Sequence, residues 1–160
     1  MQKYVIVYFL VRTSESEEFL ASEWPLHITL LANFTINRPL VDLKILLRNY
    51  CQQTKPFNVS VQGEALFGAK HNVAVSLIQP NQNISSIHQN LADLASNLGA
   101  TFDEAAYMGT GYRPHATIQA HSRLMNKQVV SLSEFTLVDM FPDHDMNRRR
   151  IIETYTFTSH

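Results

Sequence analysis

The sequence predicts a single α+β domain, residues 1–160, in which two similar lobes face each other. The length lies within the usual range of one domain, and no Gly-, Ser- and Pro-rich linker divides the chain. Strand-like and helix-like segments alternate along it. A strand, a helix and a second strand carrying His-x-Thr occur before residue 34, and again between residues 72 and 120. This weak internal duplication indicates two related halves.

Seven segments have the composition of strands. Residues 3–11 form a run of β-branched and aromatic side chains, which is typical of a buried strand. Phe57, Val59 and Val61 alternate with polar neighbours, as in a strand with one buried face. The expected strands are residues 3–11, 26–33, 57–61, 72–79, 114–120, 134–140 and 149–158.

Three helices are expected between these strands. Residues 14–21 begin with Ser and Glu in capping order, which predicts a short helix. Residues 39–52 keep apolar side chains at helical spacing and begin with Pro39. Residues 84–98 show the clearest helical pattern, with Asn83 as the expected N-cap and Gly99 just beyond the end. Residues 99–112 are expected to form an irregular loop.

Charge and composition restrict the class of partner. The net charge is −1, whereas a protein that holds long nucleic acid through its backbone is expected to show a basic excess. A small nucleotide or an RNA end is therefore the expected partner. The basic run Arg148-Arg149-Arg150 follows two aspartates and is expected to be a solvated hairpin connection.

The expected location follows from what the sequence lacks. No apolar segment is long enough to span a membrane, and no signal-peptide pattern occurs. The single cysteine, Cys51, fits a reducing compartment and is expected to be a structural thiol on a helix. We therefore expect a cytoplasmic monomer that does not bind membranes.

Two His-x-Thr triplets carry the candidate chemistry. On a strand, residues i and i+2 share a face, so each triplet places an imidazole beside a hydroxyl, with an apolar residue behind them. Each histidine also has an aromatic residue three positions earlier and a proline nearby. The two segments are Trp24-Pro25-Leu26-His27-Ile28-Thr29-Leu30 and Tyr112-Arg113-Pro114-His115-Ala116-Thr117-Ile118.

A pair of imidazoles can perform both proton transfers of phosphodiester cleavage. Near neutral pH one histidine can accept a proton from the attacking oxygen while the other donates one to the leaving oxygen. Threonine hydroxyls can donate hydrogen bonds to phosphoryl oxygens, where negative charge increases in the transition state. Neither role requires a metal ion, ATP or another cofactor.

The two triplets and the segments around them resemble the two-histidine (2H) phosphoesterase superfamily. Its members include 2′-5′ RNA ligases, cyclic nucleotide phosphodiesterases and 2′,5′-oligoadenylate phosphodiesterases. The resemblance covers nearly the whole chain. It implies two antiparallel sheets flanked by helices around a central cleft, in a bilobal pseudo-two-fold arrangement whose lobes are not contiguous in sequence. It further implies that His27 and His115 are the acid–base pair and that Thr29 and Thr117 hold the phosphate.

The flanking residues favour one branch of that family's chemistry. RNA ligases often have Phe-Leu-Gly after the first triplet and Arg five residues after the second histidine, whereas Leu31-Ala32-Asn33-Phe34 and Ala120 stand here. We therefore expect a metal-independent phosphodiesterase that acts on a 2′,3′-cyclic phosphate or a 2′,5′ linkage. Two alternatives stay open, a nucleotide- or RNA-end-binding module without turnover and a 2′-5′ RNA ligase.

Three further residues are candidates for binding the substrate. Arg113 lies two residues before His115, so on a continuous strand it shares the cleft face and can contact phosphate or a base. The alternative is a surface arginine at a strand entrance. Phe34 and Phe67 are candidates for stacking on a base, with packing in the core as the alternative.

Overall fold

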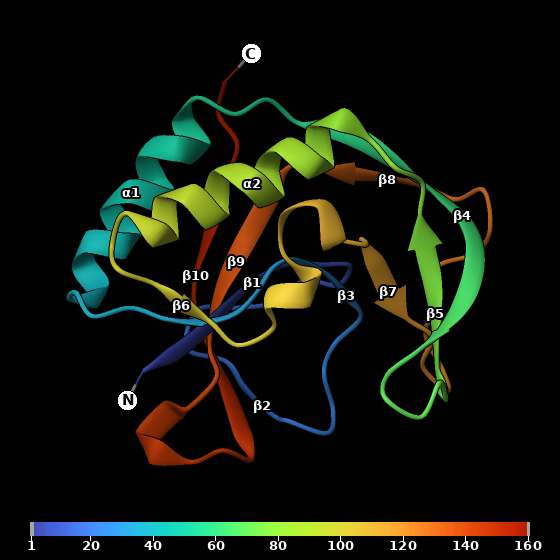
Figure 1. Ribbon diagram of the computed structural model, residues 1–160, viewed down its shortest axis with the longest axis horizontal. Helices are drawn as coiled ribbons and strands as arrows, with labels where there is room; N and C mark the ends of the chain where they lie inside the picture. Colours follow the sequence, from blue (N-terminus) through green and yellow to red (C-terminus); the bar gives the residue numbers. More distant parts are fainter. Residues whose placement is uncertain (1, 160) are drawn as a thin grey trace.

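The computed structural model describes residues 2–159 and contains two antiparallel sheets and two long helices (Figure 1). The expected α+β fold of two antiparallel sheets is confirmed. None of the helices in this part of the chain is long and apolar enough to cross a membrane.

The larger sheet has six strands in the order β2-β10-β9-β1-β3-β6. It takes its strands from both ends of the chain, because β1 pairs with β9 and β9 pairs with β10. The sequence of β1, KYVIVYF, explains its central place, since its β-branched and aromatic side chains suit a strand that is buried on both faces. The strands are β1 (Lys3–Phe9), β2 (Glu18–Leu20), β3 (His27–Thr35), β6 (Thr101–Phe102), β9 (Glu134–Asp139) and β10 (Arg148–Thr156).

The smaller sheet has four strands in the order β7-β5-β4-β8, and it curves along the other side of the molecule (Figure 1). These strands are β4 (Phe57–Phe67), β5 (Val73–Ile78), β7 (His115–Thr117) and β8 (Val129–Leu132). The pairing of β4 with β5 shifts between Val61 and Glu64. Gly63 lies at this irregularity with φ of 84°, a backbone conformation that costs glycine little.

The two helices pack against the six-stranded sheet and against each other (Figure 1). Helix α1 (Leu40–Gln52) lies against β10, and helix α2 (Gln82–Ser96) lies against β3. The apolar stripe of α2 includes Ile84, Ile87 and Leu91, and all three are buried. They join one large core cluster with side chains from both sheets, which fixes the sheets relative to each other.

Two local predictions need correction. The expected helix at residues 14–21 is wrong, because Glu18–Leu20 pairs as an edge strand with the start of β10, opposite Arg148 to Arg150. The pairing overrides the local capping pattern, and the Phe19 ring packs on Trp24 with ring centroids 4.9 Å apart. The N-cap of α2 is Asn81 rather than Asn83, since the Asn81 side chain accepts from the backbone N–H groups of Asn83 and Ile84.

The structure also differs from the sequence prediction in the extent of several elements. Strand β4 continues to Phe67, β7 is shorter than expected, and the expected loop contains β6 and two 3₁₀ turns, Ala105–Tyr107 and Gly109–Gly111. The short strand β8 was not predicted. The run Arg148 to Arg150 begins β10 instead of forming a hairpin connection.

Candidate active site

Each His-x-Thr triplet begins a strand, one in each sheet. His27 begins β3 opposite Phe9 of β1, and His115 begins β7 opposite Leu77 of β5. The middle residues Ile28 and Ala116 are buried, while both histidines are only partly buried. The alternation expected from the sequence is thus confirmed within both triplets.

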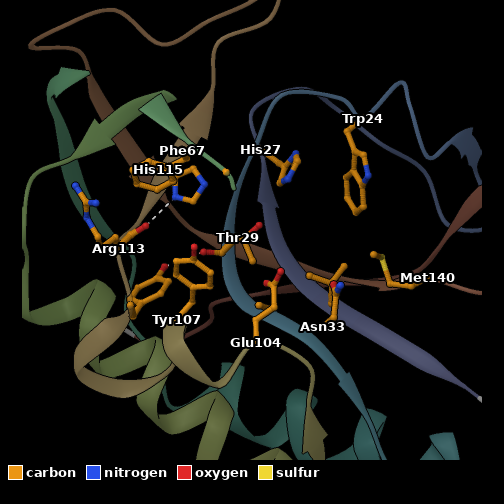
Figure 2. A pocket seen from close by; sticks show the side chains of 14 residues that line it. Trp24, His27, Thr29, Asn33, Phe67, Glu104, Tyr107, Arg113, His115 and Met140 are labelled. Carbon is orange, nitrogen blue, oxygen red and sulfur yellow. Dashed lines mark hydrogen bonds between the residues drawn. The ribbon is translucent and has the colours of Figure 1, made fainter. Parts of the chain in front are cut away.

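A cleft between the two sheets brings most of the predicted site residues together (Figure 2). Its volume is about 360 Å³, which is within the range of small-molecule sites. His27 and Thr29 reach it from β3, while His115 reaches it from β7. Figure 2 shows the two imidazoles on facing sides of this space. Its lining also includes Trp24, Ala32, Asn33, Phe67, Glu104, Tyr107, Tyr112, Arg113 and Met140.

Thr117 lies slightly apart from this group. It lines an adjoining hollow together with Ser22, Glu23 and Gln119, and that hollow shares Trp24 and His27 with the cleft. His27 therefore stands between the two spaces. Three of the four predicted triplet residues, His27, Thr29 and His115, thus line the cleft, and the fourth, Thr117, lines the adjoining hollow.

Both imidazoles are held in the same tautomer by a short local hydrogen bond. His27 Nδ1 lies 2.9 Å from the carbonyl oxygen of Pro25, and His115 Nδ1 lies 2.7 Å from that of Arg113. A carbonyl oxygen only accepts, so each Nδ1 carries a hydrogen and donates it. Nε2 is then the nitrogen that exchanges a proton in each ring.

The surroundings lower the pKa of both histidines. Burial is the main cause for His27, and the nearby charge of His115 adds to it, while the bond to Pro25 opposes the shift. Burial also dominates for His115, and the Arg113 guanidinium lowers its pKa further, against the raising effect of the hydrogen bond to the Arg113 carbonyl. In the free protein at neutral pH both rings are therefore mainly neutral, with Nε2 able to accept a proton.

Different aromatic side chains support the two histidines. The His27 ring lies against Trp24, with centroids 4.6 Å apart, and Phe9 lies further away at 6.1 Å. The His115 ring meets Phe67 at 4.5 Å in an edge-on arrangement. Arg113 places its guanidinium carbon 4.7 Å from the centre of the same Phe67 ring, a cation–π contact that holds the positive charge beside the cleft.

The prediction that Phe34 stacks on a base needs correction. Its ring is fully buried and packs on Tyr4 and Phe102 in the core. Phe34 is seven residues after His27, and an odd separation along a strand reverses the face. Each of the two pairing irregularities between β1 and β3 shifts the alternation by one residue, so together they leave this parity unchanged, with Asn33 in the cleft and Phe34 in the core. Phe67 and Arg113, by contrast, line the cleft as expected.

A buried histidine outside the triplets connects both sides of the cleft. His88 on α2 is 2% exposed, and its Nδ1 lies 2.8 Å from the carbonyl oxygen of Leu30. Its Nε2 accepts from the N–H of Gly109 at 3.0 Å. The Tyr112 ring stacks on it at 4.0 Å, and the Tyr112 hydroxyl donates to the Thr29 carbonyl at 2.8 Å. His88 therefore links α2, β3 and the turn before β7.

Other cleft residues were not identified from the sequence. Glu104 and Tyr107 come from the segment between α2 and β7, which has no periodicity to show which side chains face inward. Asn33 lies six residues after His27 in β3. Counting alternate positions gives its face correctly only because two pairing irregularities between them cancel, so the sequence alone offered no secure signal for it. Among residues 2–159, no group of three His, Cys, Asp or Glu side chains has an arrangement that could hold a metal ion.

Comparison with known proteins places this geometry in context. No curated protein matches the chain. Three similar solved structures are TT0787 of Thermus thermophilus (TM-score 0.64, 17% identity, 100% of both chains), a phosphoesterase (0.59, 15%, 99% of both) and E. coli LigT complexed with 3′-AMP (0.61, 14%, 99% of both). At such identities the likeness shows the fold.

A family model provides the stronger evidence. The model described as the 2′-5′ RNA ligase superfamily matches residues 11–131, and this range includes both triplets. It therefore spans most of the chain and both strands that carry the triplets. The resemblance seen in the two triplets is confirmed, and the protein belongs to the 2′-5′ RNA ligase superfamily, the 2H phosphoesterases.

Proposed function

We propose that the protein is a metal-independent phosphodiesterase that acts on a nucleotide or RNA end, at a 2′,3′-cyclic phosphate or a 2′,5′ linkage. One observation carries the proposal: two imidazoles in the same Nδ1–H tautomer line one cleft from opposite sheets. The LigT structures with 3′-AMP, ATP, NADP⁺ and phosphate support a small nucleotide as the ligand class.

The reaction on a cyclic phosphate needs two proton transfers. One neutral histidine accepts a proton through Nε2 from a water molecule while the water oxygen bonds to phosphorus. The phosphorus–oxygen bond to the 2′ or 3′ oxygen breaks, and the other histidine, protonated on Nε2, donates its proton to that oxygen. The product is a nucleoside monophosphate, and the two histidines have exchanged their protonation states.

A 2′,5′ linkage can be cleaved with the same groups. The base accepts the proton of the free 3′-hydroxyl, whose oxygen attacks phosphorus, and the acid protonates the leaving 5′ oxygen. The products are a 2′,3′-cyclic phosphate and a free 5′-hydroxyl. In both reactions Thr29, Thr117 and Arg113 supply hydrogen bonds or positive charge to the phosphoryl oxygens as their negative charge increases.

The lowered pKa values of the two histidines fit this chemistry once the substrate is present. Both rings are mainly neutral in the free protein, so the base is ready but the acid still has to gain a proton. A phosphodiester brings one negative charge into the cleft, and a nearby opposite charge raises a histidine pKa. The bell-shaped pH dependence of kcat should therefore lie at higher pH than that of kcat/KM.

The direct test is hydrolysis of nucleoside 2′,3′-cyclic phosphates and of 2′,5′-ApA in excess EDTA. We expect wild-type turnover to be unaffected by the chelator and to be lost in His27→Ala and His115→Ala. Turnover that needs an added divalent ion, or that persists in both variants, contradicts the mechanism. Tight nucleotide binding without turnover of any substrate would instead indicate a binding module.

A second arm of this test addresses end-joining. Incubation of an RNA that has a 2′,3′-cyclic phosphate with one that has a 5′-hydroxyl reports the reverse reaction. We expect hydrolysis to exceed joining. A joined 2′,5′-linked product that outweighs the hydrolysed one would assign the protein as a ligase.

A further inference from the structure

Another hollow, distinct from the one lined by Thr117, adjoins the catalytic cleft. It is lined by Lys3, Asn33, Met140, Phe141, Met146 and Arg149, and we call it the Arg149 hollow. Asn33 and Met140 line both spaces, and Figure 2 shows these two side chains on the far side of Thr29 from Arg113. The Arg149 hollow has a volume of about 380 Å³, similar to that of the cleft. Each space thus has the size of a site for one small ligand.

Arg149 gives this hollow a positive charge that no carboxylate neutralises by direct contact. Its neighbours Arg148 and Arg150 form salt bridges with Glu18 and Asp143 on the other face of β10. Arg149 points away from those acids, and no acidic side chain of the described chain lies within salt-bridge distance of it. Its positive charge is therefore available to a ligand.

The Arg149 side chain is also held in place. Its Nη1 donates to the carbonyl oxygens of Met140, Met146 and Arg148 at 2.9 to 3.0 Å, and its buried Nε has no hydrogen-bond partner. Burial lowers the pKa of Arg149, although the charge of Asp139 acts against this. A fixed, partly desolvated guanidinium with no carboxylate in direct contact is well placed to gain a charge-assisted contact from an anion beside it. Lys3, the other cation of this hollow, already forms a salt bridge with Asp103 at 2.6 Å. An anionic ligand is therefore assigned to Arg149.

The rest of the lining is apolar and partly open to solvent. Met146 is 73% exposed, although methionine is usually buried, and Met140 and Phe141 lie beside it. Flexible thioethers and an aromatic ring adapt well to the flat face of a heterocyclic base. An apolar surface next to a fixed guanidinium suits a nucleoside that carries a phosphate better than it suits a bare phosphate.

We propose that the Arg149 hollow binds a second nucleoside phosphate unit, so that the preferred ligand is a dinucleotide or a short oligonucleotide end. This inference rests on the proposed function for the position of the reacting phosphate between the histidines. The second phosphate lies against Arg149, and its base contacts Met140, Phe141 and Met146. The junction at Asn33 and Met140 carries the connecting ribose.

The test compares binding of the dinucleotide ApAp with that of 3′-AMP, measured by calorimetry without any requirement for turnover. Wild type should bind ApAp at least about tenfold more tightly, because a charge-assisted contact to a second phosphate is added. Met146→Glu, which adds a negative charge at an exposed position, should remove most of this gain. Arg149→Gln should remove it as well. Met125→Glu is the matched control, since Met125 is 58% exposed and outside both spaces, and it should keep the gain.

The outcomes separate this inference from the proposed function. Equal binding of ApAp and 3′-AMP by wild type, or a gain that Met146→Glu leaves intact, overturns the Arg149 hollow as a subsite. A gain that is lost in Met146→Glu supports it even where no substrate is hydrolysed, in which case the proposed phosphodiesterase activity alone fails. Since Met146 is exposed, a folding defect does not obscure its variant.

Discussion

The strand that carries His27 lies inside a six-stranded sheet between β1 and β6, whereas the strand that carries His115 is a three-residue edge strand. Both strands nevertheless hold their histidine through the same bond, from Nδ1 to the carbonyl oxygen two residues earlier. The rings differ in what lies next to them. His27 contacts Trp24, while His115 contacts Phe67 and lies beside the Arg113 charge.

This comparison separates two properties of the site. The tautomer is set locally by each triplet and the residues just before it, so it is the same on both sides. The proton affinity depends on the surroundings, which differ. We therefore expect the two histidines to share one tautomer but to differ in proton affinity, as an acid–base pair requires.

The largest effect is expected from His27→Gln and His115→Gln. Each should lower kcat on a cyclic nucleotide by about 10²- to 10⁴-fold, and the double variant should cost little more than the worse single one. A nucleotide p-nitrophenyl ester, whose leaving group needs no proton, should rescue the variant that lacks the acid and not the one that lacks the base. Rescue of both variants, or of neither, would show that the roles are not divided.

A smaller effect is expected from the two threonines, again unequally. Thr29→Val should lower kcat by about 10²-fold, as for the loss of one donor to a developing oxyanion, because Thr29 lines the cleft itself. Thr117→Val should cost less, about tenfold, because Thr117 lines the adjoining hollow. The serine variants keep a hydroxyl and serve as controls. An equal loss in both valine variants would place the phosphate midway between the two spaces.

The role of His88 in linking β3 to the turn before β7 can be tested through the stability of the protein. His88→Phe keeps the stacking on Tyr112 but leaves the Leu30 carbonyl and the Gly109 N–H without a partner. The free energy of unfolding in urea should fall by about 1–3 kcal/mol for each unpaired group. A change below 0.5 kcal/mol, roughly the scatter of surface substitutions, would mean that His88 does not brace the site.

The same histidine predicts a pH dependence with a definite sign. Burial lowers the pKa of His88, so the His88 ring binds a proton less tightly in the folded protein than in the unfolded chain. Its contribution to stability is complete above the unfolded pKa of about 6.5 and is lost as the pH falls through the lowered folded pKa. Wild type should therefore lose more stability than His88→Phe between neutral and acidic pH. Parallel curves would contradict this.

The smallest expected effect is a change in the pKa of one histidine, His115. The Arg113 charge helps to lower the pKa of His115, so Arg113→Gln should raise that pKa and leave the pKa of His27 nearly unchanged. Titration of the histidine ring resonances by NMR in the free protein measures both values. Arg38→Gln, at a remote and exposed arginine, is the control and should move neither resonance.

The sequence predicted the parts of the site that depend on strand periodicity. Alternation placed His27 with Thr29 and His115 with Thr117. It gives the correct face for Phe34 only because two pairing irregularities in β3 cancel, and between them Leu31 is buried and Ala32 lines the cleft. It could not place Glu104 or Tyr107, since a turn without periodicity gives each side chain its own direction. It also failed at residues 18–20, where pairing with a distant strand decides the structure and local capping residues do not.

Two hydrogen bonds join the region around His27 to the segments on either side of β7. The Tyr112 hydroxyl donates to the Thr29 carbonyl, and the Gln119 side chain donates to the Trp24 carbonyl at 2.8 Å, so one bond lies before His115 in the chain and the other after it. Together they fix the spacing of the histidines before any ligand arrives. The consequence is kinetic. Nucleotide association should follow a single exponential whose rate rises linearly with ligand concentration, because no closing motion has to follow the first encounter.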